Sequence, residues 1–296
     1  MTVLMQVLTL FLLMLCGLIA IKTKLMDDKA MGMINTFLLN FALVGLVISK
    51  MQQDASPELL MDLVWMFILS CAFMILGGVV ASRLFLREGH DRRAVLISLC
   101  TISNCAYMGY PVITAVMGAE ALIYAVVFTA AFNLLSWTVC AYYFGGREAM
   151  QPARLLRNPS LIAVIIGLVL FLTGLHLPKF VNDALDALGS TTTPLAMFVI
   201  GARLISLRPH HLKDKNLLIA CALRLIIIPL AVLLLHLTPL STAMVNALYM
   251  CIAMPGAAMT AMQAELFSCD KELASRGVAL STALSLITIP VMLMLI

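Results

Sequence analysis

Long apolar runs separated by short polar connectors fill the whole chain, and this alternation predicts a protein built from membrane-spanning helices. A helix crosses a hydrocarbon core of about 30 Å with roughly 20 residues, and most of the runs have about that length. Ten spans are predicted from the limits of the runs, at residues 3–21, 30–49, 59–86, 93–117, 121–144, 160–174, 181–207, 216–237, 242–266 and 273–296. The pattern therefore predicts an all-α polytopic membrane protein with ten transmembrane helices.

The fourth and ninth predicted spans are interrupted near their centres. Residues 103–111 read SNCAYMGYP, and residues 253–259 read AMPGAAM. Pro111 has no backbone N–H to donate and its ring clashes with the carbonyl four residues earlier, so we expect a break there. Tyr110 is expected to leave helical dihedrals, and Gly109 to permit unusual ones. Broken helices at mid-membrane depth are typical of transporter substrate sites, and a pair of unrelated proline kinks is the alternative.

The interruptions also indicate how the chain is divided. A polar connector, GGREAMQPARLLRNP, separates five spans from five spans. Because each half has an odd number of spans, the second half begins on the opposite side of the membrane, and similar halves would be inverted repeats. Each half carries its interruption in its fourth span. We therefore expect a first five-helix repeat at residues 1–144, a cytoplasmic linker at 145–157 and a second, inverted repeat at 158–296.

The positive charges lie on alternate connectors. The connectors that follow the first, third, fifth, seventh and ninth spans hold 16 of the 19 lysines and arginines. Since cytoplasmic loops of membrane proteins are enriched in these residues, these connectors are predicted to be cytoplasmic. Both termini are then expected to lie outside, with the multi-pass chain in the bacterial inner membrane, which is the plasma membrane.

Composition narrows the classes of function. Of the 296 residues, 62% are hydrophobic and 11% are charged, which leaves no soluble domain outside the spans and no basic run to predict a nucleic-acid partner. None of the eight cysteines forms a CxxC pair, so no metal site, cofactor or disulfide framework is predicted. A membrane-embedded enzyme would need clustered acidic residues or a nucleophile with its base, and no DxxxD, HExxH or GxSxG motif occurs. A carrier is therefore favoured over an enzyme.

At the interruptions the sequence resembles the auxin efflux carrier family, which includes bacterial PIN-like transporters. The stretch SNCAYMGYPV is similar to the fourth-helix pattern of that family, with Asn104, Gly109 and Pro111 in the matching places. MPGAAMTAMQAELFSCDKELAS is similar to its Met-Pro-x-Ala stretch, and PLAMFVIGARL to its Pro-Leu-Ala stretch followed by glycine. In two departures, Met259 stands where the family often has asparagine, and the second span lacks the family's proline.

The resemblance, which covers nearly the whole chain, implies both a fold and a function. It implies two inverted five-helix repeats in which the fourth and ninth helices cross as broken helices. It implies a secondary transporter of small organic anions, such as auxin-like, monocarboxylate or dicarboxylate substrates, that works by alternating access. A homodimer surrounded by membrane lipid is implied by the same analogy.

The chemistry of the interruptions also favours a carboxylate-bearing substrate. Helix N-termini at the breaks would offer partial positive charge and unpaired N–H groups. Asn104 can donate and accept hydrogen bonds, so it can hold a carboxylate or, alternatively, tie down the freed backbone; packing is the alternative role for Tyr107. The residues expected around the substrate are Asn104, Tyr107, Gly109, Pro111, Pro255, Gly256, Met259, Thr260 and Gln263.

Arg224 lies inside the eighth predicted span, roughly 12 Å from its start at helical rise. We expect its side chain to extend back to the cytoplasmic interface, with a bond to substrate or to a helix C-terminus as the alternatives. A sodium-coupled bile-acid-type transporter with a related crossover fold is the nearest rival function, and it would need clustered sodium ligands at the break. Only Asn104, Thr101, Gln263 and Glu265 are available for that role.

Overall fold

The described part of the chain is helical from end to end. In the computed structural model, residues 3–150, 159–206 and 214–296 are described, and they form helices and connectors with no β-strand. Five of these helices are long and apolar enough to cross a membrane, at Asp28–Lys50, Pro57–Leu84, Ala119–Ala149, Lys215–Leu237 and Lys271–Leu293. Shorter apolar helices lie at Leu8–Lys22, Cys105–Met117, Pro159–Thr173 and Thr242–Ala253. The all-α class is confirmed, and the helices agree with a polytopic membrane protein.

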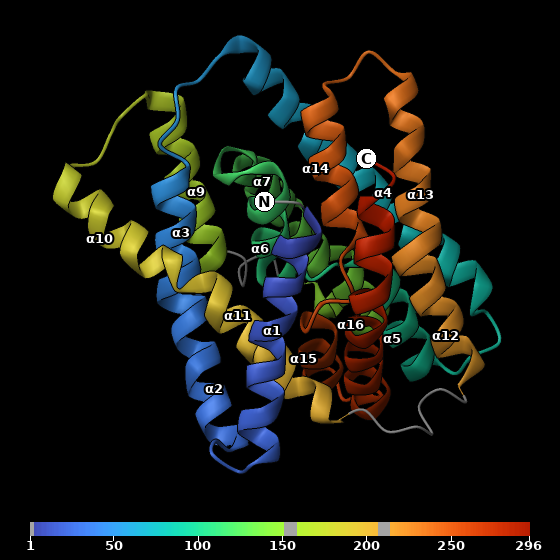
Figure 1. Cartoon of the computed structure of the whole chain (residues 1–296). Helices are drawn as coiled ribbons and strands as arrows, with labels where there is room; N and C mark the ends of the chain where they lie inside the picture. Colours follow the sequence, from blue (N-terminus) through green and yellow to red (C-terminus); the bar gives the residue numbers. More distant parts are fainter. Residues whose placement is uncertain (1–2, 151–158, 207–213) are drawn as a thin grey trace.

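The α-helices of the first half follow one another along the chain, and several are joined end to end by a short turn of another helix type (Figure 1). They are α1 (Val3–Lys22), α2 (Asp28–Phe37), α3 (Leu43–Lys50), α4 (Pro57–Leu84), α5 (His90–Thr101), α6 (Tyr110–Met117), α7 (Leu122–Leu135) and α8 (Ala141–Ala149). Turns of π-helix lie at Leu38–Ala42, Cys105–Gly109 and Ser136–Cys140, and a 3-10 turn lies at Ala119–Ala121.

The second half has the same character. Its α-helices are α9 (Pro159–Thr173), α10 (Lys179–Ser190), α11 (Thr192–Arg203), α12 (Lys215–Ala222), α13 (Ile228–Leu233), α14 (Thr242–Ala253), α15 (Met259–Leu266) and α16 (Lys271–Leu293). A π-helical turn at Leu223–Ile227 joins α12 to α13, and 3-10 turns lie at Leu204–Ser206 and Leu234–Leu237.

Local sequence explains where several helices begin. Five helices begin with a capping residue, whose side chain accepts a hydrogen bond from the backbone N–H three residues later. The caps are Asp27 for α2, Ser56 for α4, Asp214 for α12, Ser241 for α14 and Asp270 for α16. Each cap satisfies one of the N–H groups that have no partner in the first helical turn. The helices therefore start close to the beginnings of the apolar runs.

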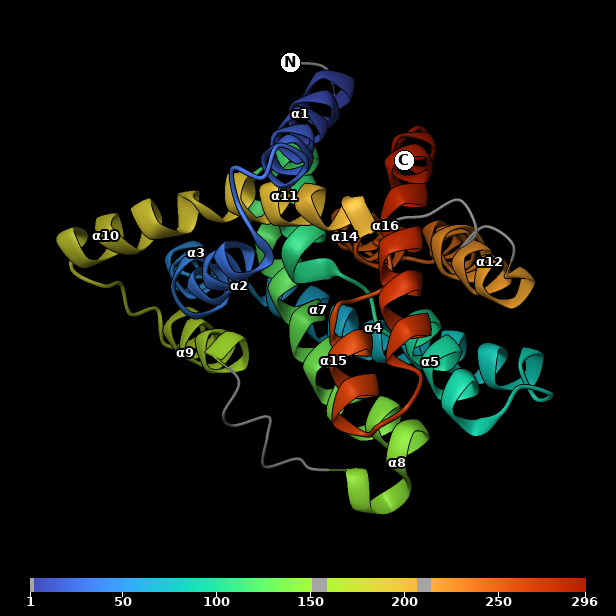
Figure 2. The same cartoon turned by 90° about the horizontal axis from the view of Figure 1, so that it is seen from below.

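The predicted continuous seventh span at residues 181–207 is wrong. The helix is divided at Thr191, where α10 ends and α11 begins, and Pro194 lies in the first turn of α11. A proline is tolerated in a first turn because the N–H that it lacks would have no partner there. Helix α10 packs against α3, with Lys50 Nζ 2.6 Å from Asp186 Oδ1, and projects from the side of the molecule in both views (Figures 1 and 2).

Helices α1 and α11 pack closely along one another. Gly17 on α1 faces the backbone of α11 so tightly that an added Cβ would overlap the carbonyl of Phe198. In the same way, an added Cβ on Gly201 would overlap the carbonyl of Met14. Small residues at such contacts let helix backbones approach in a membrane, where van der Waals packing holds helices together.

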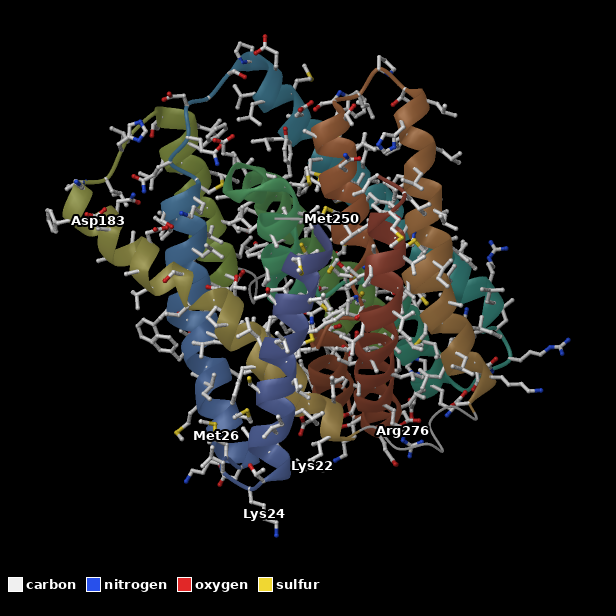
Figure 3. All side chains as sticks on the ribbon, viewed as in Figure 1. Lys22, Lys24, Met26, Asp183, Met250 and Arg276 are labelled. Carbon is white, nitrogen blue, oxygen red and sulfur yellow. The ribbon has the colours of Figure 1, made fainter. Side chains whose placement is uncertain are left out.

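Basic residues gather at one end of the helices. Lys22, Lys24 and Arg276 lie at that end in Figure 3, whereas Asp183 lies in the opposite half of the molecule. Arg92 joins the connector before α5 to the start of α12, because its guanidinium lies 2.9 Å from both Glu88 and Asp214.

Candidate transport site

The two interruptions meet in the interior. Helix α5 ends at Thr101 and α14 ends at Ala253, and each is followed by an extended residue, Ile102 and Met254. The two extended stretches lie antiparallel, with an isolated bridge between Ser103 and Gly256. The N–H of Asn104 donates to the carbonyl of Pro255 at 2.8 Å, and the N–H of Ala257 donates to the carbonyl of Ile102 at 3.3 Å. The backbone groups freed by each break are thus satisfied largely by the other, as a membrane interior requires.

The break in the fourth predicted span lies earlier than expected. Tyr110 (φ −56°, ψ −52°) is helical, so the expectation that it leaves helical dihedrals is wrong, and Gly109 (φ −68°, ψ −45°) is helical as well. The non-helical residues are 102–104 instead, with Ile102 extended and Asn104 at φ −79° and ψ 54°. Pro111 stands in the first turn of α6, directly after the π-helical turn Cys105–Gly109. That wider turn accommodates the proline ring, so the helix continues through it.

A cavity of about 360 Å³ lies beside this junction. Its walls come from the end of α1, from α2 and α11, from the Asn104 and Ala258 ends of the two interruptions, and from α16. Its polar lining residues are Asp28, Asn35, Asn104, Tyr107, Arg203, Ser275 and Thr282. The cavity therefore combines an apolar body with a few polar groups, as small-molecule sites do.

Asn104 is the polar residue of the junction that faces this cavity. It is 8% exposed, and its side-chain amide makes no hydrogen bond to any residue that the structure describes. The neighbouring Tyr107 hydroxyl donates to Asn35 Oδ1 at 2.9 Å. Because a buried amide normally has partners, the unpaired amide of Asn104 leaves donors and an acceptor for a bound molecule.

The nine residues expected around the substrate are placed differently with respect to the cavity. Asn104 and Tyr107 are among its lining residues, and the other seven, Gly109, Pro111, Pro255, Gly256, Met259, Thr260 and Gln263, are not. The Thr260 hydroxyl lies 3.0 Å from that of Ser98, and the Gln263 amide donates to the carbonyl of Ser136. Both side chains therefore hold α15 against its neighbours.

Arg203, Asn35 and Asp28 are cavity residues that the sequence analysis missed. Arg203 follows the cavity residue Val199 by four positions and so lies on the same face of α11, but only the tertiary fold shows that this face lines the cavity. No local signal marks Asn35 or Asp28 either, because their place in the cavity depends on how α2 meets α11 and α16.

The expectation that Arg224 extends back to the interface is wrong. Its side chain is 1% exposed, and its Nε donates to the carbonyl of Met254 at 3.1 Å. Its Nη1 donates to the carbonyl of Cys100 at 3.4 Å. These carbonyls stand at the C-terminal ends of α14 and α5, where helical carbonyls lack partners and carry partial negative charge. The alternative that Arg224 pairs with a helix C-terminus is thus confirmed, for two helices at once.

The residues available for a sodium site do not gather at one point. Thr101 donates to the carbonyl of Ile97 in its own helix, Gln263 donates to the carbonyl of Ser136, and Glu265 is exposed. Of the four candidates, only Asn104 lines the cavity.

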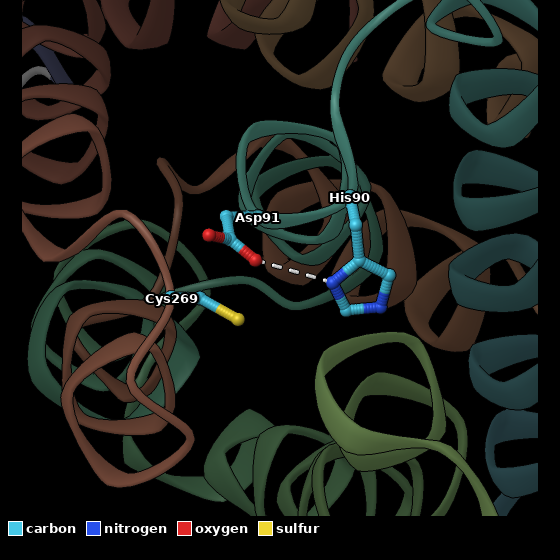
Figure 4. Close-up of side chains that lie close together, drawn as sticks. All are labelled: His90, Asp91 and Cys269. Carbon is cyan, nitrogen blue, oxygen red and sulfur yellow. Dashed lines mark hydrogen bonds and ion pairs between the residues drawn. The ribbon is translucent and has the colours of Figure 1, made fainter.

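A group of possible metal ligands lies apart from the cavity. His90 and Asp91 at the start of α5 meet Cys269 of the connector between α15 and α16, and their ligand atoms lie within 4.8 Å of one another (Figure 4). Burial, together with the carboxylate of Asp91, raises the pKa of the Cys269 thiol to about 11. These donor types can bind zinc, but none of the three residues lines the cavity, so the cavity is built without them.

Comparison with known proteins decides the family. The family model described as "Membrane transport protein" matches residues 2–151 and 148–293. The chain belongs to this membrane transport family, the auxin efflux carrier-like proteins. The match confirms the resemblance read from the interruptions.

Archaeal relatives of the same family cover almost all of the chain. An uncharacterized transporter of Methanocaldococcus jannaschii is 25% identical over 300 residues, which covers 96% of this chain and 95% of that protein. An uncharacterized transporter of Methanothermobacter thermautotrophicus is 25% identical over 296 residues, with the same coverage. Family and relatives together support a multi-pass secondary transporter.

Proposed function

We propose that this auxin efflux carrier-like protein is a carrier of small organic anions, such as auxin-like acids, monocarboxylates or dicarboxylates, and that the substrate carboxylate binds at Asn104. The observation that carries the proposal is the meeting of two helix starts and an unpaired buried amide at one cavity of about 360 Å³. The helical segment from Cys105 and helix α15 both begin beside that cavity. Unpaired N–H groups and partial positive charge at helix starts favour an anion.

Side chains of the cavity add to this preference. The amide of Asn104 can donate to one carboxylate oxygen, and the guanidinium of Arg203 supplies a full positive charge at the cavity wall. Asp28 also lines the cavity, so its carboxylate repels an anion that approaches it. The volume lies in the range of small-molecule sites, which agrees with a small organic acid.

We propose that the chain is built from two inverted repeats, at residues 1–144 and 158–296. A linker at residues 145–157 joins them, and residues 151–157 of this linker lie outside the described residues. The pairing of the interruptions supports this architecture, because one comes from each half. The boundary between the two matched segments of the family model, at residues 148–151, also falls in the linker. The fourth and ninth helices would cross as broken helices, and the bundle that contains them would rock against the other helices to expose the site alternately.

The basic end of the molecule is proposed to face the cytoplasm, with both termini outside, in the bacterial inner membrane. Ile21, Asp28 and Ser275 line the cavity and lie toward that end, so the proposed orientation would make this an inward-facing state. Cysteines replacing Lys24 and Asp54, in a background lacking Cys16, Cys71 and Cys269, test the orientation. Lys24→Cys is expected to react with an impermeant maleimide only in inside-out vesicles, and Asp54→Cys only in right-side-out vesicles; the reverse pattern would overturn the proposal.

The family resemblance also leads us to propose a homodimer in lipid, with no nucleic-acid partner and no enzymatic activity. Light scattering of the detergent-purified protein, corrected for bound detergent, is expected to give twice the 32.2 kDa of one chain. A monomer mass would contradict the dimer and leave the transport site unaffected.

A binding screen tests the proposed substrate class. Mono- and dicarboxylates are added one at a time to the purified protein, and the melting temperature is measured as a function of concentration. At least one carboxylate is expected to raise the melting temperature saturably in sodium-free buffer. Stabilisation by none of them would reject the organic-anion proposal, and stabilisation only with sodium would favour a bile-acid-type mechanism.

A further inference from the structure

Arg224 is a buried cation in an apolar segment, and the structure shows no carboxylate paired with it among the described residues. A charged side chain inside a membrane protein is costly and marks a functional position. Something must therefore stabilise this charge. Its two hydrogen bonds go to backbone carbonyls, those of Cys100 and Met254.

The two carbonyls belong to the negative ends of two helices. Cys100 lies in the last turn of α5, and Met254 directly follows α14. The partial charges at these C-termini both face Arg224, so the guanidinium replaces the missing partners of both helices and neutralises both ends. A neutral donor would also satisfy the carbonyls. Arg224 also buries a third nitrogen, Nη2, which has no hydrogen-bond partner among the described residues. Completing the two hydrogen bonds alone would not require this extra buried nitrogen or the positive charge, so we assign a further role to the charge.

The same junction has a positive side. A few residues beyond Cys100 and Met254, the segment from Cys105 and helix α15 begin beside the cavity. Four helix ends are thus brought within one small region, two negative and two positive. An anion in the cavity is attracted by the helix starts and repelled by the helix C-termini, unless these are compensated.

We propose that Arg224 sets the charge selectivity of the transport site, because it neutralises the C-termini of α5 and α14, so that of the four helix ends only the two positive starts act on the bound anion. The proposal rests on the proposed function of the cavity. It makes Arg224 a positioning residue with an electrostatic role, which acts on the substrate without contact.

The test compares a carboxylate that stabilises the wild type with the neutral primary amide of the same compound. Dissociation constants for both are measured in detergent for the wild type, Arg224→Gln, Arg224→Lys and the control Arg87→Gln. The control removes the same charge from an exposed connector residue outside the cavity lining. The ratio of the two constants reports charge selectivity, whereas a purely structural role would weaken acid and amide alike.

Arg224→Gln is expected to weaken carboxylate binding about tenfold, which is about 1.4 kcal/mol, and to change amide binding less than about twofold. Arg224→Lys keeps the charge and is expected to retain the wild-type ratio, as is Arg87→Gln. An unchanged ratio in a folded Arg224→Gln protein would overturn the proposal. If Arg224→Gln does not fold, a folded Arg224→Lys protein that loses the selectivity would overturn it, and one that keeps it supports it. A wild type that binds no carboxylate rejects the proposed function itself, so the two failures are distinct.

Discussion

Replacing Asn104 with alanine separates the role of its amide from the structure of the junction. The backbone of Asn104 carries the pairing, since its N–H donates to the carbonyl of Pro255 and its carbonyl accepts from the N–H groups of Met108 and Gly109. All of these bonds survive in Asn104→Ala. The side-chain amide has no hydrogen-bond partner among the described residues, so its loss is expected to change the free energy of unfolding by less than about 1 kcal/mol.

Binding should respond much more strongly. A hydrogen bond to a charged group contributes about 1.5–3 kcal/mol, and every 1.4 kcal/mol corresponds to a factor of ten. Asn104→Ala is therefore expected to raise the dissociation constant of a carboxylate by roughly 10- to 100-fold. Isothermal titration calorimetry of the purified protein measures this constant, and thermal melting without ligand measures the stability.

Asn40→Ala is the matched control. Asn40 is an exposed asparagine whose amide donates to the carbonyl of Thr36 in its own helix, and it does not line the cavity. Its replacement is expected to leave the dissociation constant unchanged. The reasoning is refuted if Asn104→Ala binds carboxylates as tightly as the wild type, or if its melting temperature falls enough to account for the lost binding.

Three further predictions concern the packing, motion and charge of the fold. Gly201→Ala is expected to destabilise the protein by about 1–3 kcal/mol, because the new Cβ would overlap the backbone carbonyl of Met14 on α1; an unchanged melting temperature would contradict this close approach. The sulfur atoms of Cys105 and Cys251 lie 3.4 Å apart. Oxidative cross-linking of these two cysteines is expected to leave transport intact, because the two interruptions are proposed to move as one body. Transport that is lost on cross-linking and restored by reductant would show that the interruptions move against each other. Burial opposes ionisation of Asp214, but hydrogen bonds from Arg92 and from a backbone N–H lower its pKa. The ionised carboxylate therefore stabilises the fold at pH values above the ordinary pKa of an aspartate. This stabilisation is lost as the pH falls through the lowered pKa of the folded protein. The difference in melting temperature between wild type and Asp214→Asn should therefore close below about pH 4, and a difference independent of pH would contradict the prediction.

The apolar runs were sufficient to predict the helical class, since burial in lipid imposes long apolar helices whatever their tertiary packing, and the glycines and prolines within the runs marked the two interruptions. They were not sufficient to locate the first break. Pro111 is the strongest local signal, yet a π-helical turn accommodates it, and the non-helical backbone lies at 102–104, where pairing with Pro255 and Gly256 stabilises it. That pairing depends on residues about 150 positions away, which no local pattern can report.

The candidate site shows the same division between local and distant information. Asn104, expected to bind substrate, lines the cavity, and it could be singled out because an asparagine within an apolar span is a local signal. Arg224 was placed wrongly at the interface, because its partners are the ends of two helices that only the tertiary fold brings together. Arg203 lines the cavity at the end of α11, and its place there became visible only once α11 lay against α2.

Counterflow in proteoliposomes tests the central claim most directly. Vesicles that contain the purified protein are loaded with an unlabelled carboxylate selected by the binding screen, and uptake of the labelled compound is followed over time. The account predicts saturable uptake that is stimulated by the internal substrate, retained in Asn40→Ala and lost in Asn104→Ala. Uptake that rises linearly with concentration, or that is equal in Asn104→Ala and the wild type, would contradict a carboxylate carrier built around Asn104.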